Sequence, residues 1–277
     1  PQDPVQIQYT SGTTGFPKGA TLSHYNLVNN ALALAEKFGI QPGKRFLAGM
    51  PLFHTGGCVC HALTAIAGGG TIIEMIHFDP LKMMQSLQNE RATHYLGVPT
   101  MLIAIMQHQE FTDYDFSSLE VMISGGSPVP IDVANEVEKK WGCKVMVIYG
   151  LTEASPMITM PSMDEPLELR VETVGSPLPY MEVKIADPES GQPVPLGEYG
   201  ELCNRGYNIM MGYYKMPDKT AETIDEEGWL HTGDLAVMRE SGHCNIVGRI
   251  KDMIIRGGEN IYAREIEELL ITHPKIM

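Results

Sequence analysis

A loop near the start of the chain has the residue types that bind phosphate. Between Thr10 and Lys18 the sequence has four hydroxyl side chains, two glycines and one cation, with little side-chain bulk before Phe16. Glycines reach backbone angles that other residues avoid, so successive N–H groups can point at one anion, while the hydroxyls add donors and Lys18 adds charge. The alternative is an ordinary turn, because Gly, Ser and Thr are common in loops. A Walker A loop is disfavoured, because Gly19 follows Lys18 where that motif has a Ser or Thr for magnesium.

Two further strings follow predicted strands and suit a magnesium nucleotide. Residues 124–128 read Ser-Gly-Gly-Ser-Pro, and glycines there let a flat ring lie against the backbone. Residues 149–153 read Tyr-Gly-Leu-Thr-Glu, where Glu153 can hold Mg²⁺ together with phosphate oxygens and Thr152 can donate to phosphate. Taken alone, the first string is a plain βα turn, and the second is a helix start where the dipole favours Glu.

The second half of the chain adds a carboxylate that could bind ribose hydroxyls, and two cationic side chains. Asp234 ends the string Trp-Leu-His-Thr-Gly-Asp, and a carboxylate can accept hydrogen bonds from both ribose hydroxyls. An Asp after Gly is otherwise a turn residue. Arg249 and Lys251 follow in Gly-Arg-Ile-Lys-Asp, whose alternative is a strand with solvated charges.

In the first half of the chain, His54 is part of Pro-Leu-Phe-His-Thr-Gly-Gly and follows a predicted strand. The alternative is an ordinary histidine at a helix start.

Together these strings resemble the adenylate-forming enzymes, which include acyl-CoA synthetases, luciferases and peptide-synthetase adenylation domains. The resemblance covers nearly the whole chain, in the order and roughly the spacing of that family. Residues 255–262 (Ile-Arg-Gly-Gly-Glu-Asn-Ile-Tyr) resemble the acyl-CoA synthetase branch. Residues 1–4, 11–18, 22–26 and 273–274 are especially similar to the family member 2 type of medium-chain acyl-CoA synthetase.

The resemblance implies a role for each matching residue. The loop would grip the β- and γ-phosphates, residues 126–128 and Tyr149 would contact adenine, Asp234 the ribose, and Arg249 the ribose and phosphate. The implied catalytic residues are Lys18, His54 at the carboxylate site, Thr152, Glu153 and the hinge residue Lys251, with Glu153 as the metal ligand. The implied nucleotide- and cofactor-binding residues are Thr10, Ser11, Gly12, Thr13, Thr14, Gly15, Phe16, Pro17, Lys18, Gly126, Ser127, Pro128, Tyr149, Gly150, Thr152, Asp234, Arg249 and Gly258, the last in a loop lining a thiol tunnel.

The implied function is ATP-dependent activation of a fatty acid, with a medium-chain acid expected, to acyl-AMP and then acyl-CoA. ATP, Mg²⁺ and coenzyme A are the implied cofactors and co-substrates. The family has a catalytic lysine near its C-terminus that this sequence does not match, so we expect the chain to bind ATP or acyl-AMP and to adenylate poorly. The alternatives are an adenylation domain that loads an amino or aryl acid onto a carrier protein, and a non-catalytic nucleotide-binding module.

Strands and helices are predicted to alternate over the first half of the chain. Helices are expected at 24–38, 57–67, 80–89, 99–109 and 131–141, between strands at 5–9, 45–50, 71–76, 93–98, 119–124 and 144–149. Alternation of this kind predicts an α/β fold with a parallel-rich sheet and helices on both faces. Proline-punctuated apolar runs then predict a small β-barrel or sandwich over about 171–247. We expect an α/β subdomain at 1–165, a β-rich subdomain at 166–248, and at 249–277 a hinge and the start of a small α+β C-terminal domain with an acidic helix at 262–272.

Composition narrows the class of protein. An apolar content of 43% is enough for a packed core, and a net charge of −14 argues against non-specific binding to nucleic acid or anionic membranes. The five cysteines are scattered without CxxC spacing, which indicates reduced thiols and does not predict structural zinc. No apolar run approaches the ~18 residues of a membrane span, and no signal pattern opens the chain. We expect a cytoplasmic protein, or a mitochondrial matrix protein in a eukaryote; the oligomeric state stays open, a homodimer being one option.

Overall fold

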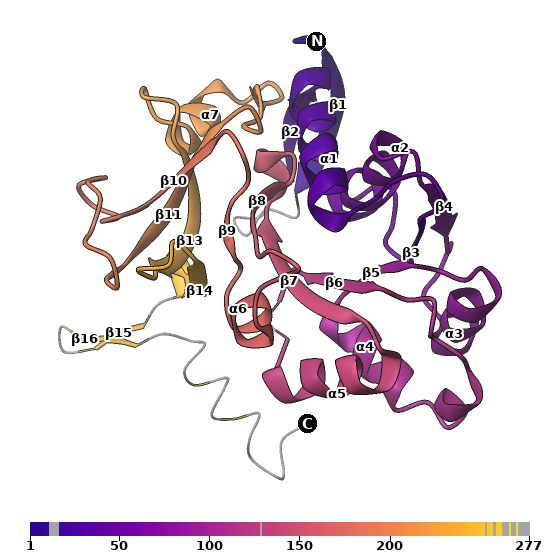
Figure 1. Ribbon diagram of the computed structural model, residues 1–277. Helices are drawn as coiled ribbons and strands as arrows, with labels where there is room; N and C mark the ends of the chain where they lie inside the picture. The colour runs from indigo at the N-terminus through magenta and orange to yellow at the C-terminus, as the bar shows by residue number, and fades with distance from the viewer. Residues whose placement is uncertain are drawn as a thin grey trace.

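The computed structural model describes residues 1–10, 17–127, 129–252, 254–256, 259–261, 266 and 270. Within these residues a larger α/β half and a smaller β-rich half lie side by side (Figure 1). None of the helices described there combines the length and the apolar character needed to cross a membrane. The expected helix at 262–272 falls almost entirely outside the described residues, and before it a hairpin of β15 (Ile254–Arg256) and β16 (Glu259–Ile261) is present.

A seven-stranded sheet forms the centre of the α/β half, in the order β4-β3-β5-β6-β7-β8-β9. Its first five strands are parallel, which confirms the predicted parallel-rich sheet, and β8 turns back antiparallel to β7. The strand bounds are β3 Arg45–Ala48, β4 Thr71–Glu74, β5 His94–Gly97, β6 Val121–Gly125, β7 Lys144–Gly150, β8 Met157–Met160 and β9 Ser176–Pro177.

Helices cover both faces of this sheet, because alternate side chains of each central strand point to opposite sides. In β7, Val145 and Val147 join the core under α3, α4, α5 and α6, whereas Met146 and Ile148 join the core under α1 and α2. Figure 1 places α3, α4 and α5 on one side of the strands and α1 and α2 on the other. The helix bounds are α1 His24–Phe38, α2 Thr64–Ala67, α3 Pro80–Asn89, α4 Pro99–Met106, α5 Ile131–Trp141 and α6 Leu167–Glu172, with a 3-10 turn η2 at Phe111–Asp113.

Local signals place the ends of the long helices. Ser23 caps α1 in a reciprocal pair with Asn26, and Gly39 ends the helix in the left-handed conformation. Asp79 accepts a hydrogen bond from the backbone of Lys82 to start α3. These ends coincide with the predicted ones because the capping residues are adjacent in sequence to the helices that they cap.

The helix expected at 57–67 is divided into two segments. Residues Gly56–Leu63 form a π-helical segment, η1, and α2 follows it. The backbone N–H of Thr64 bonds the carbonyl of Val59, five residues earlier, and the Thr64 hydroxyl donates to the same carbonyl at 2.8 Å. This side-chain bond supports the wider turn, which hydrophobic spacing alone does not reveal.

The start of the chain forms a three-stranded sheet with a strand from far along the sequence. Strands β1 (Pro4–Thr10) and β2 (Lys18–Ser23) pair antiparallel, with Thr10 opposite Lys18. Strand β12 (Gly212–Tyr213) adds to the other edge of β2, and α7 (Pro217–Thr223) follows it. The phosphate-type loop therefore connects two strands of a hairpin, unlike a Walker A loop, which leads into a helix.

The β-rich half contains one open antiparallel sheet, in the order β10-β11-β13-β14. Its strands are β10 Met181–Ala186, β11 Tyr199–Gly206, β13 Leu230–Met238 and β14 Cys244–Arg249, followed by the 3-10 turn η4 Ile250–Asp252. The barrel form of the expectation is wrong, because the described strands of this half form no closed barrel. The apolar face of the sheet, including Leu202 and Ala236, packs against Ala154 and Ile158 of the α/β half instead of a second sheet.

Backbone hydrogen bonds join the two halves near β9. Val174 N–H donates to the Cys244 carbonyl, and Cys244 N–H donates to the Gly175 carbonyl, both at 2.8 Å. Gly175 has a φ of 76°, and an added Cβ there would lie 1.9 Å from the backbone of Met160. Only glycine therefore fits this crossing point without moving the chain.

Candidate functional site

A cavity of about 1080 Å³ lies between the hairpin of β1 and β2, the central sheet and the β-rich half. Three strands of the sheet end at it with a glycine, namely Gly97 on β5, Gly125 on β6 and Gly150 on β7. These are carboxyl ends of parallel strands, where open α/β sheets bind ligands. The predicted site residues that line the cavity are Thr10, Lys18, His54, Gly126, Gly150, Thr152, Glu153, Asp234, Arg249 and Lys251.

One tyrosine hydroxyl links the predicted cation to the predicted metal ligand. Lys18 Nζ donates to the Tyr213 hydroxyl at 2.8 Å, and that hydroxyl donates to Glu153 Oε1 at 2.6 Å. The ammonium also lies 4.2 Å from the centre of the Tyr213 ring. Burial and the charge of Glu153 raise the pKa of Tyr213, so the hydroxyl keeps its proton as a donor.

Glu153 fits the role of a magnesium ligand by its position and chemistry. It lies on the 3-10 turn η3 (Thr152–Ala154) directly after β7, lines the cavity, and is only 8% exposed. Its backbone carbonyl accepts from the Met210 N–H at 2.9 Å, which fixes the turn against the segment leading to β12. Mg²⁺ is commonly held in nucleotide sites by one or two carboxylates together with phosphate oxygens. A buried carboxylate that faces a cavity meets that requirement.

A second polar group joins β7 to the β-rich sheet. Tyr149 donates its hydroxyl to Asp234 Oδ2 at 2.7 Å, and Arg249 Nε lies 3.2 Å from Asp234 Oδ1. Burial raises the pKa of Asp234, and the Tyr149 hydroxyl and the Arg249 charge oppose that rise. Burial and the nearby Asp234 charge raise the pKa of Tyr149 as well. A carboxylate has about four acceptor positions, so two remain for ligand hydroxyls.

His54 lines the cavity together with several apolar side chains. Its Nδ1 accepts a hydrogen bond from the Gly56 N–H at 3.0 Å, which leaves the proton of the neutral ring on Nε2. Desolvation lowers the pKa of His54, which favours this neutral form. Nearby lining side chains include Met50, Phe53 and Leu96. A neutral imidazole donor beside an apolar wall can orient a carboxylic acid that carries an apolar chain.

The remaining predicted residues have different outcomes. Tyr149 reaches the site through Asp234, while Pro17 and Ser127 are exposed and lie outside the cavity lining. Ser11, Gly12, Thr13, Thr14, Gly15, Phe16, Pro128 and Gly258 lie outside the described residues.

A sequence model of AMP-binding enzymes matches residues 1–214, more than three quarters of the chain. The chain belongs to the AMP-binding enzyme family. This membership agrees with the predicted resemblance and with the gathering of the predicted residues around one cavity.

Relatives of this member of the AMP-binding enzyme family are named as acyl-CoA synthetases or ligases. YngI of Bacillus subtilis, named as an acyl-CoA synthetase, is 48% identical over 274 residues, covering 99% of this chain and 50% of that protein. Human medium-chain acyl-CoA ligase ACSF2, a mitochondrial protein, is 42% identical over 99% of this chain and 46% of its own length. The chain therefore spans about half the length of the curated relatives it matches.

Solved structures support the same fold. ATP-bound MatB from Rhodopseudomonas palustris matches with a TM-score of 0.90 at 36% identity, over 99% of this chain and 53% of that one. O-succinylbenzoate coenzyme A synthetase (MenE) from Bacillus subtilis, in complex with AMP, matches with a TM-score of 0.88 at 32% identity, over 99% of this chain and 55% of that one.

Sequence reasoning missed three residues of this AMP-binding enzyme that line the cavity, namely Tyr213, Glu201 and His231. Tyr213 lies on a two-residue strand whose partner β2 is far away in sequence, so no local pattern marks it. His231 stands within the string that ends in Asp234, but nothing in that string identifies its partner Glu201. In β11 residues 200–204 are all buried, so no alternating pattern marks Glu201 either.

Proposed function

We propose that this chain forms the nucleotide- and acid-binding part of an acyl-CoA synthetase, which uses ATP to activate a carboxylic acid. The observation that carries the proposal is the convergence of Lys18, Glu153 and Asp234 on one cavity at the carboxyl ends of the sheet. These groups come from three separate parts of the sequence. Family membership and the ATP- and AMP-bound structural relatives support a nucleotide as the ligand.

In the first step, a carboxylate oxygen of the acid attacks the α-phosphorus of ATP in line and displaces pyrophosphate. Lys18 and the hydroxyl-rich loop would hold the β- and γ-phosphates, and Asp234 would hold the ribose. Glu153 would hold Mg²⁺, which neutralises phosphate charge when bound. The protein contributes mainly positioning and charge neutralisation to such a reaction. His54 would orient the acid through its Nε2–H.

In the second step, the sulfur of coenzyme A attacks the acyl carbonyl carbon of acyl-AMP and releases AMP. Lys251, which lines the cavity just after β14, is the proposed hinge for the movement that admits the thiol. The division into subdomains at 1–165, 166–248 and 249–277 remains part of this proposal.

A medium-chain fatty acid is the proposed substrate, supported by the ACSF2 relatives and by the apolar wall beside His54. The competing possibility is a different carboxylic acid, because the MenE relative is named for O-succinylbenzoate. The alternative acceptor is a carrier protein in place of coenzyme A. The relatives named mitochondrial fit the proposed alternative of a mitochondrial location, beside the cytoplasmic location expected first.

MgATP titration of charge-removing variants tests the nucleotide site. We expect Lys18→Gln and Glu153→Gln each to weaken MgATP binding about tenfold to a hundredfold, since each removes a charge-assisted contact. Lys44→Gln and Glu120→Gln are matched controls, because they form an exposed ion pair at 2.6 Å outside the cavity lining. Unchanged MgATP affinity in both site variants, measured by calorimetry, would refute the proposed site.

A graded panel of acids tests the proposed substrate. Each added CH₂ that enters an apolar pocket contributes about 0.8 kcal/mol, so KM is expected to fall about fourfold per CH₂ until the pocket is full. AMP formation is measured with coenzyme A, with a carrier protein, and with neither acceptor. Preference for an amino or aryl acid, or turnover with the carrier protein alone, would favour the alternative.

A further inference from the structure

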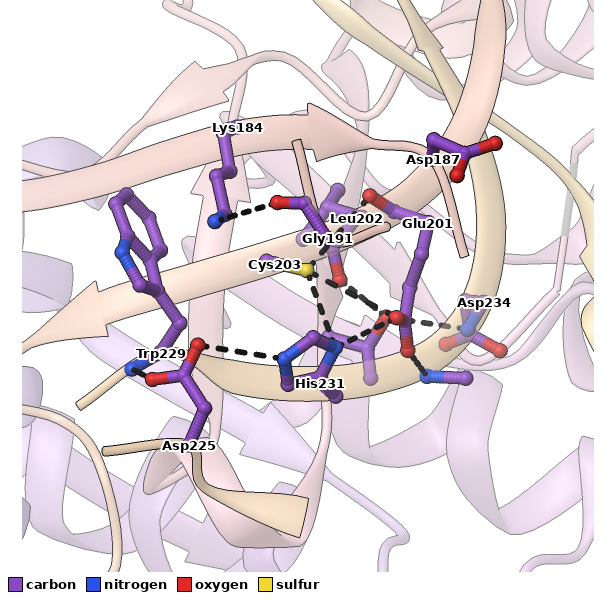
Figure 2. Close-up of polar contacts among 12 residues, drawn as sticks. Lys184, Asp187, Gly191, Glu201, Leu202, Cys203, Asp225, Trp229, His231 and Asp234 are labelled. Atoms are coloured by element: carbon purple, nitrogen blue, oxygen red, sulfur yellow. Dashed lines mark hydrogen bonds and ion pairs between the residues drawn. The ribbon is translucent and has the colours of Figure 1, made fainter. Parts of the chain in front are cut away.

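A cluster of three different ligand types lies on β11 and on β13, the strand that carries Asp234. Glu201 and Cys203 on β11 and His231 on β13 place a carboxylate oxygen, a sulfur and an imidazole nitrogen within 4.8 Å of one another (Figure 2). Within the part of the chain that the structure describes, this is the one place where three such atoms come so close. The proposed reaction uses none of the three.

The sheet itself builds the cluster. Glu201 and Cys203 are two positions apart on β11, so their side chains share a face, and Cys203 stands directly opposite His231 in the antiparallel register. Cys203 is completely buried and Glu201 is 7% exposed, while His231 remains partly open. Glu201 and His231 also line the large cavity, which gives an ion a route to the cluster.

Of the three ligand-to-ligand distances, the one between sulfur and imidazole matches tetrahedral coordination, and the other two require small side-chain shifts. Cys203 Sγ lies 3.6 Å from His231 Nδ1 and 3.9 Å from Glu201 Oε2. Ligands about 2.0–2.3 Å from a tetrahedral zinc ion lie about 3.3–3.6 Å from one another. Glu201 Oε2 and His231 Nδ1 are closer, at 2.7 Å, because they share a hydrogen bond that an ion would replace. We propose that Glu201, Cys203 and His231 bind a divalent transition-metal ion of the Zn²⁺ class.

Outer partners already orient two of the three ligands. Asp225 Oδ2 lies 3.5 Å from His231 Nε2, on the far side of the ring from Cys203. The Gly233 N–H donates to Glu201 Oε1 at 2.8 Å, which leaves Oε2 facing the cluster. Metal-binding histidines usually donate their second ring N–H to a carboxylate in this way. With three protein ligands, the fourth position of the ion is left for water.

The charges around the cluster permit a cation. Glu201 and Asp225 are acidic, and the nearest ammonium, on Lys184, is held by the Gly191 carbonyl at 3.0 Å and lies 4.6 Å from the Trp229 ring centre. The ligand set also selects the ion. Thiolate and imidazole favour zinc-like metals, whereas Mg²⁺ prefers oxygen ligands, so this site is chemically different from the proposed one at Glu153.

The same cluster is poorly suited to act as a nucleophile. Burial and the charge of Glu201 raise the pKa of Cys203 to about 12, so the free thiol stays protonated and unreactive. A bound cation reverses that effect, because a coordinating thiol loses its proton to solvent when the metal–sulfur bond forms.

Metal titration of the untagged, metal-free 277-residue chain tests this site independently of nucleotide binding. We expect one Zn²⁺ per chain by calorimetry, and Co²⁺ to give thiolate charge-transfer absorption that Zn²⁺ displaces. Cys203→Ser should remove that absorption, and both Cys203→Ser and His231→Asn should weaken Zn²⁺ binding about tenfold or more. Asp225→Asn should weaken Zn²⁺ binding about tenfold, because His231 loses the carboxylate beside its second ring nitrogen. The asparagine keeps an acceptor for the backbone N–H of Trp229.

Cys58→Ser is the matched control, because Cys58 is a more accessible thiol outside the cluster. It should bind both ions as the unaltered chain does, and circular dichroism checks that every variant is folded. The proposal is overturned if the unaltered chain shows no thiolate–Co²⁺ absorption, or if folded Cys203→Ser binds Zn²⁺ with unchanged affinity. If the unaltered chain binds Zn²⁺ but does not bind MgATP, the result contradicts the proposed function and leaves the metal site supported.

Discussion

Tyr213 connects two groups of opposite charge through a single hydroxyl. It accepts from Lys18 and donates to Glu153, so each charge is held in place before any ligand arrives. Positioning of this kind reduces the reorganisation needed when a charged substrate binds. The tyrosine is therefore a positioning residue of the proposed site.

Removal of that hydroxyl should destabilise the fold. We expect Tyr213→Phe to lower the free energy of unfolding by about 1.5–3 kcal/mol, because the buried Glu153 carboxylate loses a charge-assisted hydrogen bond. Tyr180→Phe removes a hydroxyl from a side chain that is 94% exposed, and should change stability by less than about 0.5 kcal/mol. Urea denaturation of both variants provides the comparison, and equal losses would contradict the assigned role.

The residues that could be predicted are those whose chemistry is marked by a local string. Glu153 and Asp234 each end a glycine-containing string with a recognisable order, and the structure brings both to the cavity. Tyr213, Glu201 and Cys203 carry no such string. Their partners come from other strands, and a side chain's partner across a sheet depends on strand order, which local spacing does not encode.

A buried asparagine on helix α1 binds the backbone of strand β8, which lies more than 120 positions later in the sequence. Asn30 is fully buried, donates to the Met157 carbonyl at 3.0 Å and accepts from the Met157 N–H at 3.2 Å. Hydrophobic periodicity correctly predicted the length of this helix, because its caps and its apolar face are local. It could not predict that a polar residue on the buried face satisfies the backbone of β8.

A neighbouring asparagine offers an internal comparison. We expect Asn30→Ala to lower the free energy of unfolding by about 1–3 kcal/mol, since the buried amide of Met157 loses this acceptor. Asn29→Ala, at a partly exposed position on the same helix, should stay within about 0.5 kcal/mol of the unaltered chain. Thermal unfolding by calorimetry measures both, and a similar loss at the two positions would refute the argument.

The whole molecule depends on how its two halves meet. The apolar runs and prolines of the second half correctly predicted short antiparallel strands, but the barrel was wrong because the partner layer belongs to the first half. No pattern within 166–248 could reveal that contact. The parallel sheet was predictable because each of its crossovers is a local strand–helix–strand unit.

Gly175 tests that junction. Gly175 and Gly191 both have left-handed backbone angles, with φ of 76° and 68°, but only at Gly175 does an added Cβ meet backbone atoms. Gly191→Ala should cost about 1–2 kcal/mol from backbone strain. Gly175→Ala should cost about 1–3 kcal/mol more, because Met160 and Pro161 must move. Matching unfolding midpoints for the two variants in urea would show that the crossing point tolerates a side chain.

The pairing of β2 with β12 has a consequence for biosynthesis. The ribosome makes Lys18 before its hydrogen-bond partner Tyr213, which follows 195 positions later. A nascent chain therefore presents one edge of β2 without its neighbour while the residues between them are being made. The hairpin of β1 and β2 is therefore completed only when β12 has been made, and premature termination before β12 leaves Lys18 without the tyrosine that positions it.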